Sequence, residues 1–156
     1  MYVALVIALM LVFPLISTVA QILSADHATL AAASILAVVA KWYVFWAVGV
    51  RLSLAGLRQI FQPRYTAETI LGLKGAESLF FVRELGFANV SMGSIGLASL
   101  PAPSWLTAAA TLGAIYYGLA GINHCFHQGR NKLQNLAMVS DLFAALILAI
   151  CCFARQ

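Results

Sequence analysis

Long apolar stretches separated by short polar breaks dominate the chain. Their spacing predicts five membrane-spanning helices, over about residues 2–23, 42–61, 77–100, 105–124 and 136–153. Each stretch has the roughly 20 residues that an α-helix needs to cross a hydrocarbon core about 30 Å thick. A short surface helix is predicted over about 66–73, because its polar start precedes a stop at Lys74 and Gly75. We therefore expect an all-α integral membrane bundle that forms a single transmembrane domain.

Two stretches near the N-terminus need interpretation. Residues 2–23 carry no charge, and we interpret them as a retained span, because no Lys or Arg precedes them and the apolar stretch is too long for a signal peptide. Residues 29–61 contain no proline, and one straight helix of that length would reach about 50 Å at 1.5 Å per residue. We expect residues 30–40 to form a separate or bent segment, with Trp42 to Phe61 as the crossing. A separate crossing by residues 30–40 would change the number of spans.

The composition supports a membrane protein and excludes several other classes. Apolar residues make up 63% of the 156 residues and charged residues only 9%, whereas a soluble domain is nearer half apolar and a quarter charged. The nine Lys and Arg residues are scattered, which is unlike the basic stripe of a nucleic-acid-binding protein. Membrane lipid, and not nucleic acid, is therefore the expected partner.

Motifs for catalysis are missing from the sequence. The three cysteines form no CxxC pair, which argues against a membrane thiol oxidoreductase. The chain also has no HExxH motif, no phosphate-binding loop and no recognisable nucleophile with its base. These observations favour a protein that is not an enzyme.

The basic residues predict an orientation. With five spans, the N-terminus and the loops around 58–76 and 125–135 share one side of the membrane. That side collects Arg58, Arg64, Lys74, Arg130 and Lys132, whereas the other side has only Lys41 and Arg155. The positive-inside rule then places the N-terminus in the cytoplasm and the C-terminus outside. We expect this topology in a cytoplasmic (inner) membrane.

Charged residues inside the predicted spans are the first candidates for a functional site. Arg51, Arg83, Glu84 and Asp141 lie there, where an unpaired charge costs at least about 2.5–3.5 kcal/mol. In the third span, helical spacing places Glu84 on one face. The nearly opposite face holds the small and polar residues Gly86, Asn89, Gly93 and Gly96. Small residues favour close helix contact, so the third span is expected to be the central helix.

The polar residues of the inner half of the bundle are expected to form one cluster. It consists of Arg51, Arg83, Glu84, Asn89, His124 and Asp141. One interpretation is a binding pocket or a proton-linked site that opens to the cytoplasm. The other is structural: an Arg51–Glu84 ion pair joins two helices, and Asp141 bonds to His124 for the same purpose.

The histidines do not predict a metal or haem site. His124 and His127 stand three residues apart, but the fourth span supplies no third ligand. A bis-histidine haem would need a second buried histidine, and His27 is expected on the opposite side of the membrane. No metal is therefore predicted.

Several motifs in order resemble a known family. The segments FWAVGVRLSLAGLRQIFQPRYTAETILGLK, VRELGFANVSMG, YYGLAGINH and MVSDLF are similar to the domain-of-unknown-function 6790 family of small bacterial membrane proteins. This likeness runs from about Lys41 to Phe143. Spans two to five are more loosely similar to the DoxX-like four-helix group, with the first span as an addition. That group is associated with quinone-linked or redox-associated membrane roles, and the resemblance implies Arg51 and Glu84 as the matching polar pair.

The sequence leaves two functions open. In the first, the polar cluster binds or moves a small lipophilic or weakly charged ligand, for which a quinone or a lipid is the candidate. In the second, the chain is a structural or accessory subunit without a ligand of its own. A homo-oligomer is also expected, because Gly113, Gly118 and Gly121 give the fourth span a second face for close packing.

Overall fold

The computed structural model describes residues 2–25 and 32–153, and these residues form helices joined by turns. We use the word rod for an uninterrupted stretch of helix. The first rod comprises α1 (Tyr2–Ile7), the π-helical segment η1 (Ala8–Val12) and α2 (Phe13–Ser24). The second comprises α3 (Ala32–Tyr43), the π-helical segment η3 (Val44–Val50) and α4 (Arg51–Phe61). The other rods are α5 (Ala76–Ala98), α6 (Leu106–Phe126) with the short 3₁₀ turn η5 (Pro103–Trp105) before it, and α7 (Lys132–Phe153).

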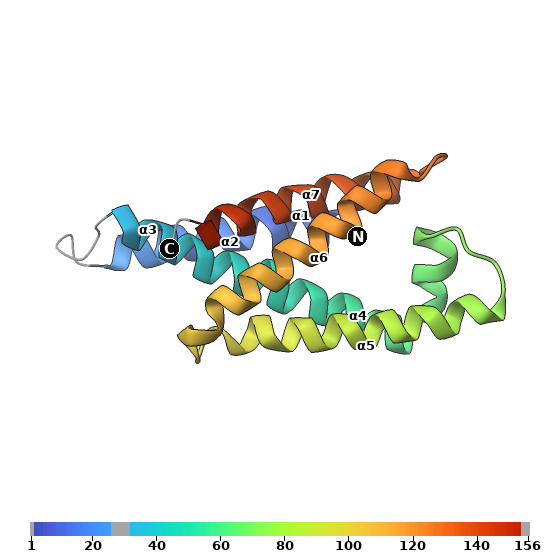
Figure 1. Ribbon diagram of the computed structural model, residues 1–156, viewed down its shortest axis with the longest axis horizontal. Helices are drawn as coiled ribbons and strands as arrows, with labels where there is room; N and C mark the ends of the chain where they lie inside the picture. Colours follow the sequence, from blue (N-terminus) through green and yellow to red (C-terminus); the bar gives the residue numbers. More distant parts are fainter. Residues whose placement is uncertain (1, 26–31, 154–156) are drawn as a thin grey trace.

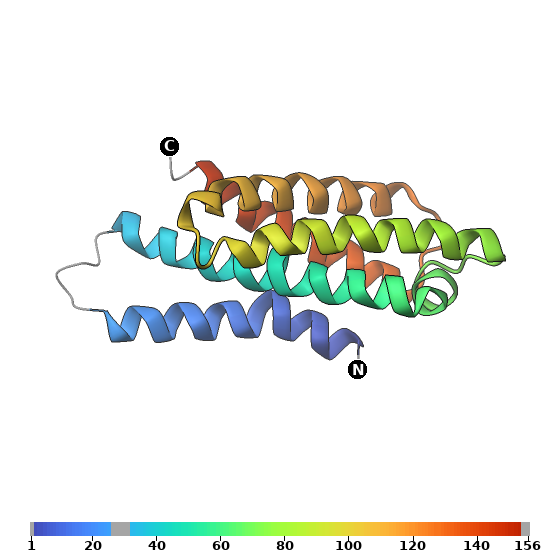
Figure 2. The same ribbon diagram turned by 90° about the horizontal axis from the view of Figure 1, so that it is seen from below.

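Successive rods run in opposite directions along one common axis (Figure 2). The start of α1, the 62–75 connection and the α6–α7 turn lie toward the same end of the bundle (Figure 1). The α5–α6 turn and the end of α7 lie toward the other end. The 62–75 connection contains one further short helix, η4 (Tyr65–Ile70), with Thr66 and Ala67 buried. It corresponds to the predicted surface helix, but it is packed into the end of the bundle.

Four helical stretches in the described part are long and apolar enough to cross a membrane. They are Tyr2–Ser24, Ile35–Phe61, Pro103–Phe126 and Lys132–Cys152. The α5 helix is not among them, although it has 23 residues and lies in the same bundle. It carries Glu77, Arg83 and Glu84, and it is less apolar as a result. The molecule is thus an all-α bundle with four apolar helices that could span a membrane.

The second rod corrects the prediction of a separate segment before Trp42. Helix continues from Ala32 to Phe61 without interruption. The stretch contains no proline, and its first glycine is Gly49, so nothing in the sequence ends the helix early. Val44, Ala47 and Val48 are fully buried in the core, which gives this stretch a packing partner along its length. The rod includes a wider π-helical turn at η3 and no break.

Side-chain hydrogen bonds join the first rod to the second. The Gln21 side-chain oxygen accepts hydrogen bonds from Lys41 Nζ at 3.1 Å and from Trp42 Nε1 at 2.7 Å. One turn further along, Trp46 Nε1 donates to Ser17 Oγ at 3.0 Å. These contacts fix the position of the first rod beside the second.

The second rod and α5 approach each other through glycines, as the small-residue face of the third span predicted. A Cβ atom added at Gly96 would lie 2.5 Å from the backbone nitrogen of Gly49, and one added at Gly56 would lie 2.6 Å from the Gly86 carbonyl oxygen. We call this contact, with Gly93 included, the glycine seam. Here the two backbones touch, so any side chain would force them apart.

The glycines of α6 correct the reason given for a homo-oligomer. A Cβ added at Gly113 would meet Val48 and Leu148, and one added at Gly121 would meet Leu142. Gly118 also faces α7, but its Cβ would meet Ala145 at an ordinary 3.7 Å. This face packs against α7 and η3 of the same chain, and it is not available to a second copy.

Candidate functional site

The buried charges meet in a pairing that the sequence did not predict. Arg51 Nη2 lies 2.8 Å from Asp141 Oδ1 and 3.1 Å from Ser140 Oγ. The two charged side chains are only 12% and 10% exposed. The expected Arg51–Glu84 pair is therefore wrong, and the Asp141 carboxylate binds Arg51 and not His124. The pair joins α4 to α7 across the interior of the bundle.

Aromatic side chains of α6 complete the surroundings of Arg51. Its guanidinium carbon lies 4.9 Å from the centre of the Tyr117 ring, within the range of a cation–π contact. The Tyr117 hydroxyl donates to the carbonyl oxygen of Ala47, which lies in η3. The π-helical turn just before Arg51 is thus tied to α6, and this tie helps to set the direction in which Arg51 leaves the rod.

A cavity of about 160 Å³ adjoins the ion pair; we call it the inner cavity. All five rods contribute to its wall. It is lined by Tyr2, Leu5, Val6, Leu9, Arg51, Leu52, Leu54, Ala55, Arg58, Gln59, Asn89, Tyr116, Tyr117, Ala137 and Asp141. Its wall therefore combines aliphatic side chains with a concentrated set of polar ones, as small-molecule sites do.

Two guanidinium groups present unused hydrogen-bond donors at this site. Arg51 Nη1 and Arg58 Nε are buried, and neither has a hydrogen-bond partner in the described structure. The Arg58 guanidinium also stacks on the ring of Tyr65, 3.6 Å from its centre. Nearby, the side-chain nitrogen of Asn89 donates to Gln59 Oε1 at 2.7 Å. Unpaired buried donors of this kind are rare, because each carries a desolvation cost.

A second cavity of about 550 Å³ continues from the inner cavity toward η4; we call it the end cavity. The two share Arg58, Gln59, Tyr116 and Asp141, among others, and His124 lines the end cavity only. The η4 residues Tyr65, Thr66 and Ile70 form its floor.

Hydrogen bonds hold η4 at the end of the bundle. Asn131 Nδ2 donates to the Ile70 carbonyl at 3.0 Å, and Gln134 Nε2 donates to the Leu71 carbonyl at 3.4 Å. Both donors come from the start of the last rod and its preceding turn. The η4 segment, held by these hydrogen bonds, therefore covers the end cavity on this side.

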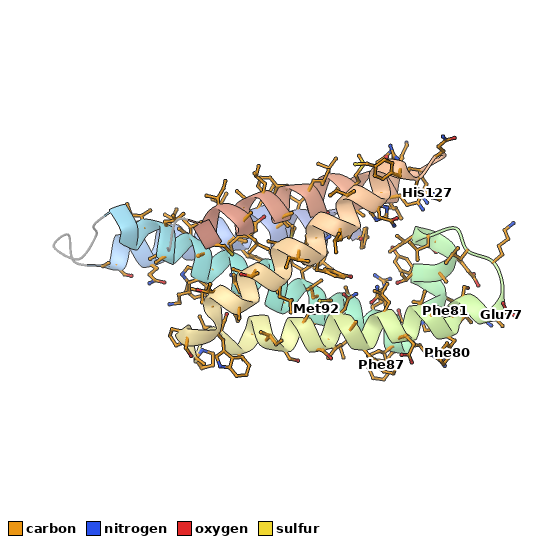
Figure 3. All side chains as sticks on the ribbon, viewed as in Figure 1. Glu77, Phe80, Phe81, Phe87, Met92 and His127 are labelled. Carbon is orange, nitrogen blue, oxygen red and sulfur yellow. The ribbon has the colours of Figure 1, made fainter. Side chains whose placement is uncertain are left out.

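The side of the bundle between α5 and α6 is less closed. These helices separate as they leave their connecting turn (Figure 1). An outer groove of about 850 Å³ lies there, lined by Met92 of α5 and mainly by α6 and η5, and Met92 is labelled in Figure 3. Tyr116 and Leu119 line both this groove and the end cavity. The groove and the end cavity thus adjoin each other at these two side chains.

The predicted cluster is brought together only in part. Arg51, Asn89 and Asp141 line the inner cavity, and His124 lines the adjoining one. Arg83 and Glu84 are exposed on α5 and line neither.

Arg58, Gln59 and the α6 tyrosines also line the cavities, although they were not among the predicted cluster residues. Arg58 shares a helix face with Arg51, because the two are seven residues apart. That spacing was the available signal, but the position of Arg58 near the end of its helix favoured an interfacial role. No pattern in the sequence singled out Gln59 or Tyr116.

Comparison with known proteins gives one match. The model of a family of unknown function, DUF6790, matches residues 4–156. The match extends beyond the Lys41–Phe143 likeness at both ends, so the first rod belongs to the family pattern. No curated protein and no solved structure matches the chain.

Proposed function

Since the chain belongs to the DUF6790 family, whose function is unknown, we propose its role from the site: it binds a small lipophilic molecule with a polar head in the inner and end cavities. The protein acts on this ligand by binding or moving it and not by catalysis. A quinone or a lipid is the candidate class. The observation that carries the proposal is the pair of unused buried donors, Arg51 Nη1 and Arg58 Nε, beside a cavity.

Two features support binding over a purely structural role for the polar cluster. One Arg–Asp pair is enough to join α4 to α7, yet Arg58 adds a second, half-buried cation that has no carboxylate partner among the described residues. A structural cluster gains nothing from an unpaired cation, because burial without a partner costs stability. A ligand that accepts hydrogen bonds would remove this cost.

The proposal includes a placement in the membrane. We propose that α5 crosses as a fifth span beside α4, with its charged first half near one surface. The basic end of the bundle then faces the cytoplasm of a bacterial cell, with the N-terminus inside and the C-terminus outside. The DoxX-like comparison belongs to this proposal too, as a four-helix arrangement to which the first rod is added.

Ligand-dependent stabilisation tests the proposal. Purified protein is heated in a neutral detergent with each of a panel of quinones and lipids, and the Tm is compared with that of the ligand-free sample. Bound ligand at 100 times its Kd stabilises by about 2.7 kcal/mol, which a thermal shift detects. We expect such a shift in the wild type, and a much smaller one in Arg58→Gln, which removes a cavity donor.

Glu84→Gln is the matched control for this experiment. It also neutralises one charge, but Glu84 is exposed and lines neither cavity. Its ligand shift should equal that of the wild type. Absence of any shift across the panel, or an unchanged shift in Arg58→Gln, would contradict the binding proposal and favour an accessory subunit.

A second candidate function rests on the outer face of α5. Phe80 and Phe87 are 62% and 51% exposed, and Figure 3 shows them on the side of α5 away from α6. Arg83 and Glu84, also exposed, flank these rings on the helix surface. The two charges lie at nearly the same depth, so two parallel copies could pair Arg83 of one with Glu84 of the other. This face, and not the α6 glycines, is the proposed homo-oligomer interface.

Charge exchange tests this interface. Arg83→Glu and Glu84→Arg should each lower the dimer fraction in lipid nanodiscs, because each places like charges together. The double variant restores opposite charges and should recover the dimer. Mass measurement distinguishes the outcomes, and a wild-type monomer in lipid would overturn the interface.

A further inference from the structure

We infer that the ligand is a single-chain amphiphile with one negative charge on its head, a carboxylate or a phosphate monoanion. This inference rests on the proposed function and specifies the chemical class of its ligand. It is carried by the charges, the unused donors and the adjoining apolar groove.

The charges that line the two cavities do not balance. Arg51, Arg58 and Asp141 are their charged residues, and His124 also lines the end cavity. These two arginines and one aspartate sum to one positive charge. A monoanion neutralises it, whereas a neutral ligand leaves it uncompensated and a cation adds to it.

The unused donors fit oxygen atoms of an anionic head. Arg51 and Arg58 lie two helical turns apart on one face, about 10 Å along α4. Both side chains line the inner cavity, and each has a buried N–H without a partner. Hydrogen bonds from guanidinium groups to carboxylate or phosphate are charge-assisted and are stronger than those to a neutral carbonyl. The inner cavity, at about 160 Å³, has room for a head group but not for a chain.

The outer groove accounts for the chain. It adjoins the end cavity at Tyr116 and Leu119, which line both spaces, and its wall is mostly apolar side chains of α6 with Met92 of α5. Because η4 covers the end of the bundle, the side between α5 and α6 offers the way in for a molecule from the membrane. A head in the inner cavity and a chain along the groove use all three spaces together.

Matched amphiphiles with the same chain test the inference. Hexadecanoate, hexadecyl phosphate and hexadecanol are titrated separately into the purified full chain in a maltoside detergent, with the Tm shift as readout. We expect both anions, or the one whose head fits better, to bind at least tenfold more tightly than hexadecanol. The stronger of the two anions identifies the carboxylate or the phosphate as the head.

Two variants separate site binding from general attraction to a basic protein. Arg58→Gln should lose at least tenfold in affinity for the anion, each measurement being referred to the variant's own ligand-free Tm. Glu84→Gln makes the protein more basic without touching the cavities, and it should bind like the wild type. Tighter anion binding in Glu84→Gln, with no loss in Arg58→Gln, would overturn the inference.

The experiment also distinguishes this inference from the proposed function. If hexadecanol binds as tightly as the anions, the site exists and the charge assignment is wrong. If none of the three stabilises the protein, and no quinone or lipid of the earlier panel does so, both fail.

Discussion

Leucine in place of either Arg51 or Asp141 alone is expected to deplete the protein from membranes, and leucine at both positions should restore much of it. The two side chains form a buried ion pair at 2.8 Å. Removal of one partner leaves the other charge buried alone, at a cost of about 3–5 kcal/mol, whereas removal of both leaves an apolar contact. The level of each variant in purified membranes and its Tm in detergent measure the effect.

The control for this cycle is Arg51→Leu with Glu84→Leu. Glu84 is exposed and does not meet Arg51, so the second change should rescue nothing. Strictly additive losses for Arg51→Leu and Asp141→Leu would show that these residues are not coupled. Ligand binding adds a second readout. Recovery of abundance without recovery of the ligand-dependent Tm shift would mark the pair as part of the site as well as of the bundle.

The positions of the rods could be predicted from the sequence because they depend on local properties. Apolar stretches of about 20 residues separated by polar turns define helices without knowledge of the fold. The glycine face of α5 could be recognised for the same reason, because the positions that share a helix face follow from the 3.6-residue repeat. Membership of the DUF6790 family was also recognisable, because several motifs occur in order.

The partner of Arg51 could not be predicted in this way. Helical spacing shows that Glu84 lies nearly opposite the glycine face of α5, but it does not show which face meets the second rod. Packing determines which face of α5 meets the second rod. The glycine seam places α5 against η3 and α4, so Glu84 is exposed on the outside. The glycine face of α5 thus lies against the second rod, and Asp141 of α7 lies next to Arg51.

The break expected before Trp42 illustrates a second limit. Bilayer thickness suggests where a helix should end, but a helix ends only where a residue or a lack of packing ends it. The second rod has neither a proline nor an early glycine, and Ala40, Tyr43 and Val44 are buried in the core. The wider turn at η3 could not be foreseen either, because π-helical segments depend on the tertiary contacts around them. In this rod that turn directly precedes Arg51.

The glycine seam gives the second large effect, and Gly96→Ala is its sharpest test. The added Cβ would lie 2.5 Å from the Gly49 nitrogen and 2.7 Å from its Cα, and both are backbone atoms that no rotamer change can move aside. The second rod and α5 must separate, at an expected cost of about 1–3 kcal/mol.

Gly118→Ala is the matched control, since its Cβ would meet Ala145 at an ordinary 3.7 Å. Alanine favours helix over glycine by about 1 kcal/mol, so Gly118→Ala should keep or raise the Tm while Gly96→Ala lowers it. Equal melting temperatures for the two variants would show that α5 does not pack on the second rod through this seam.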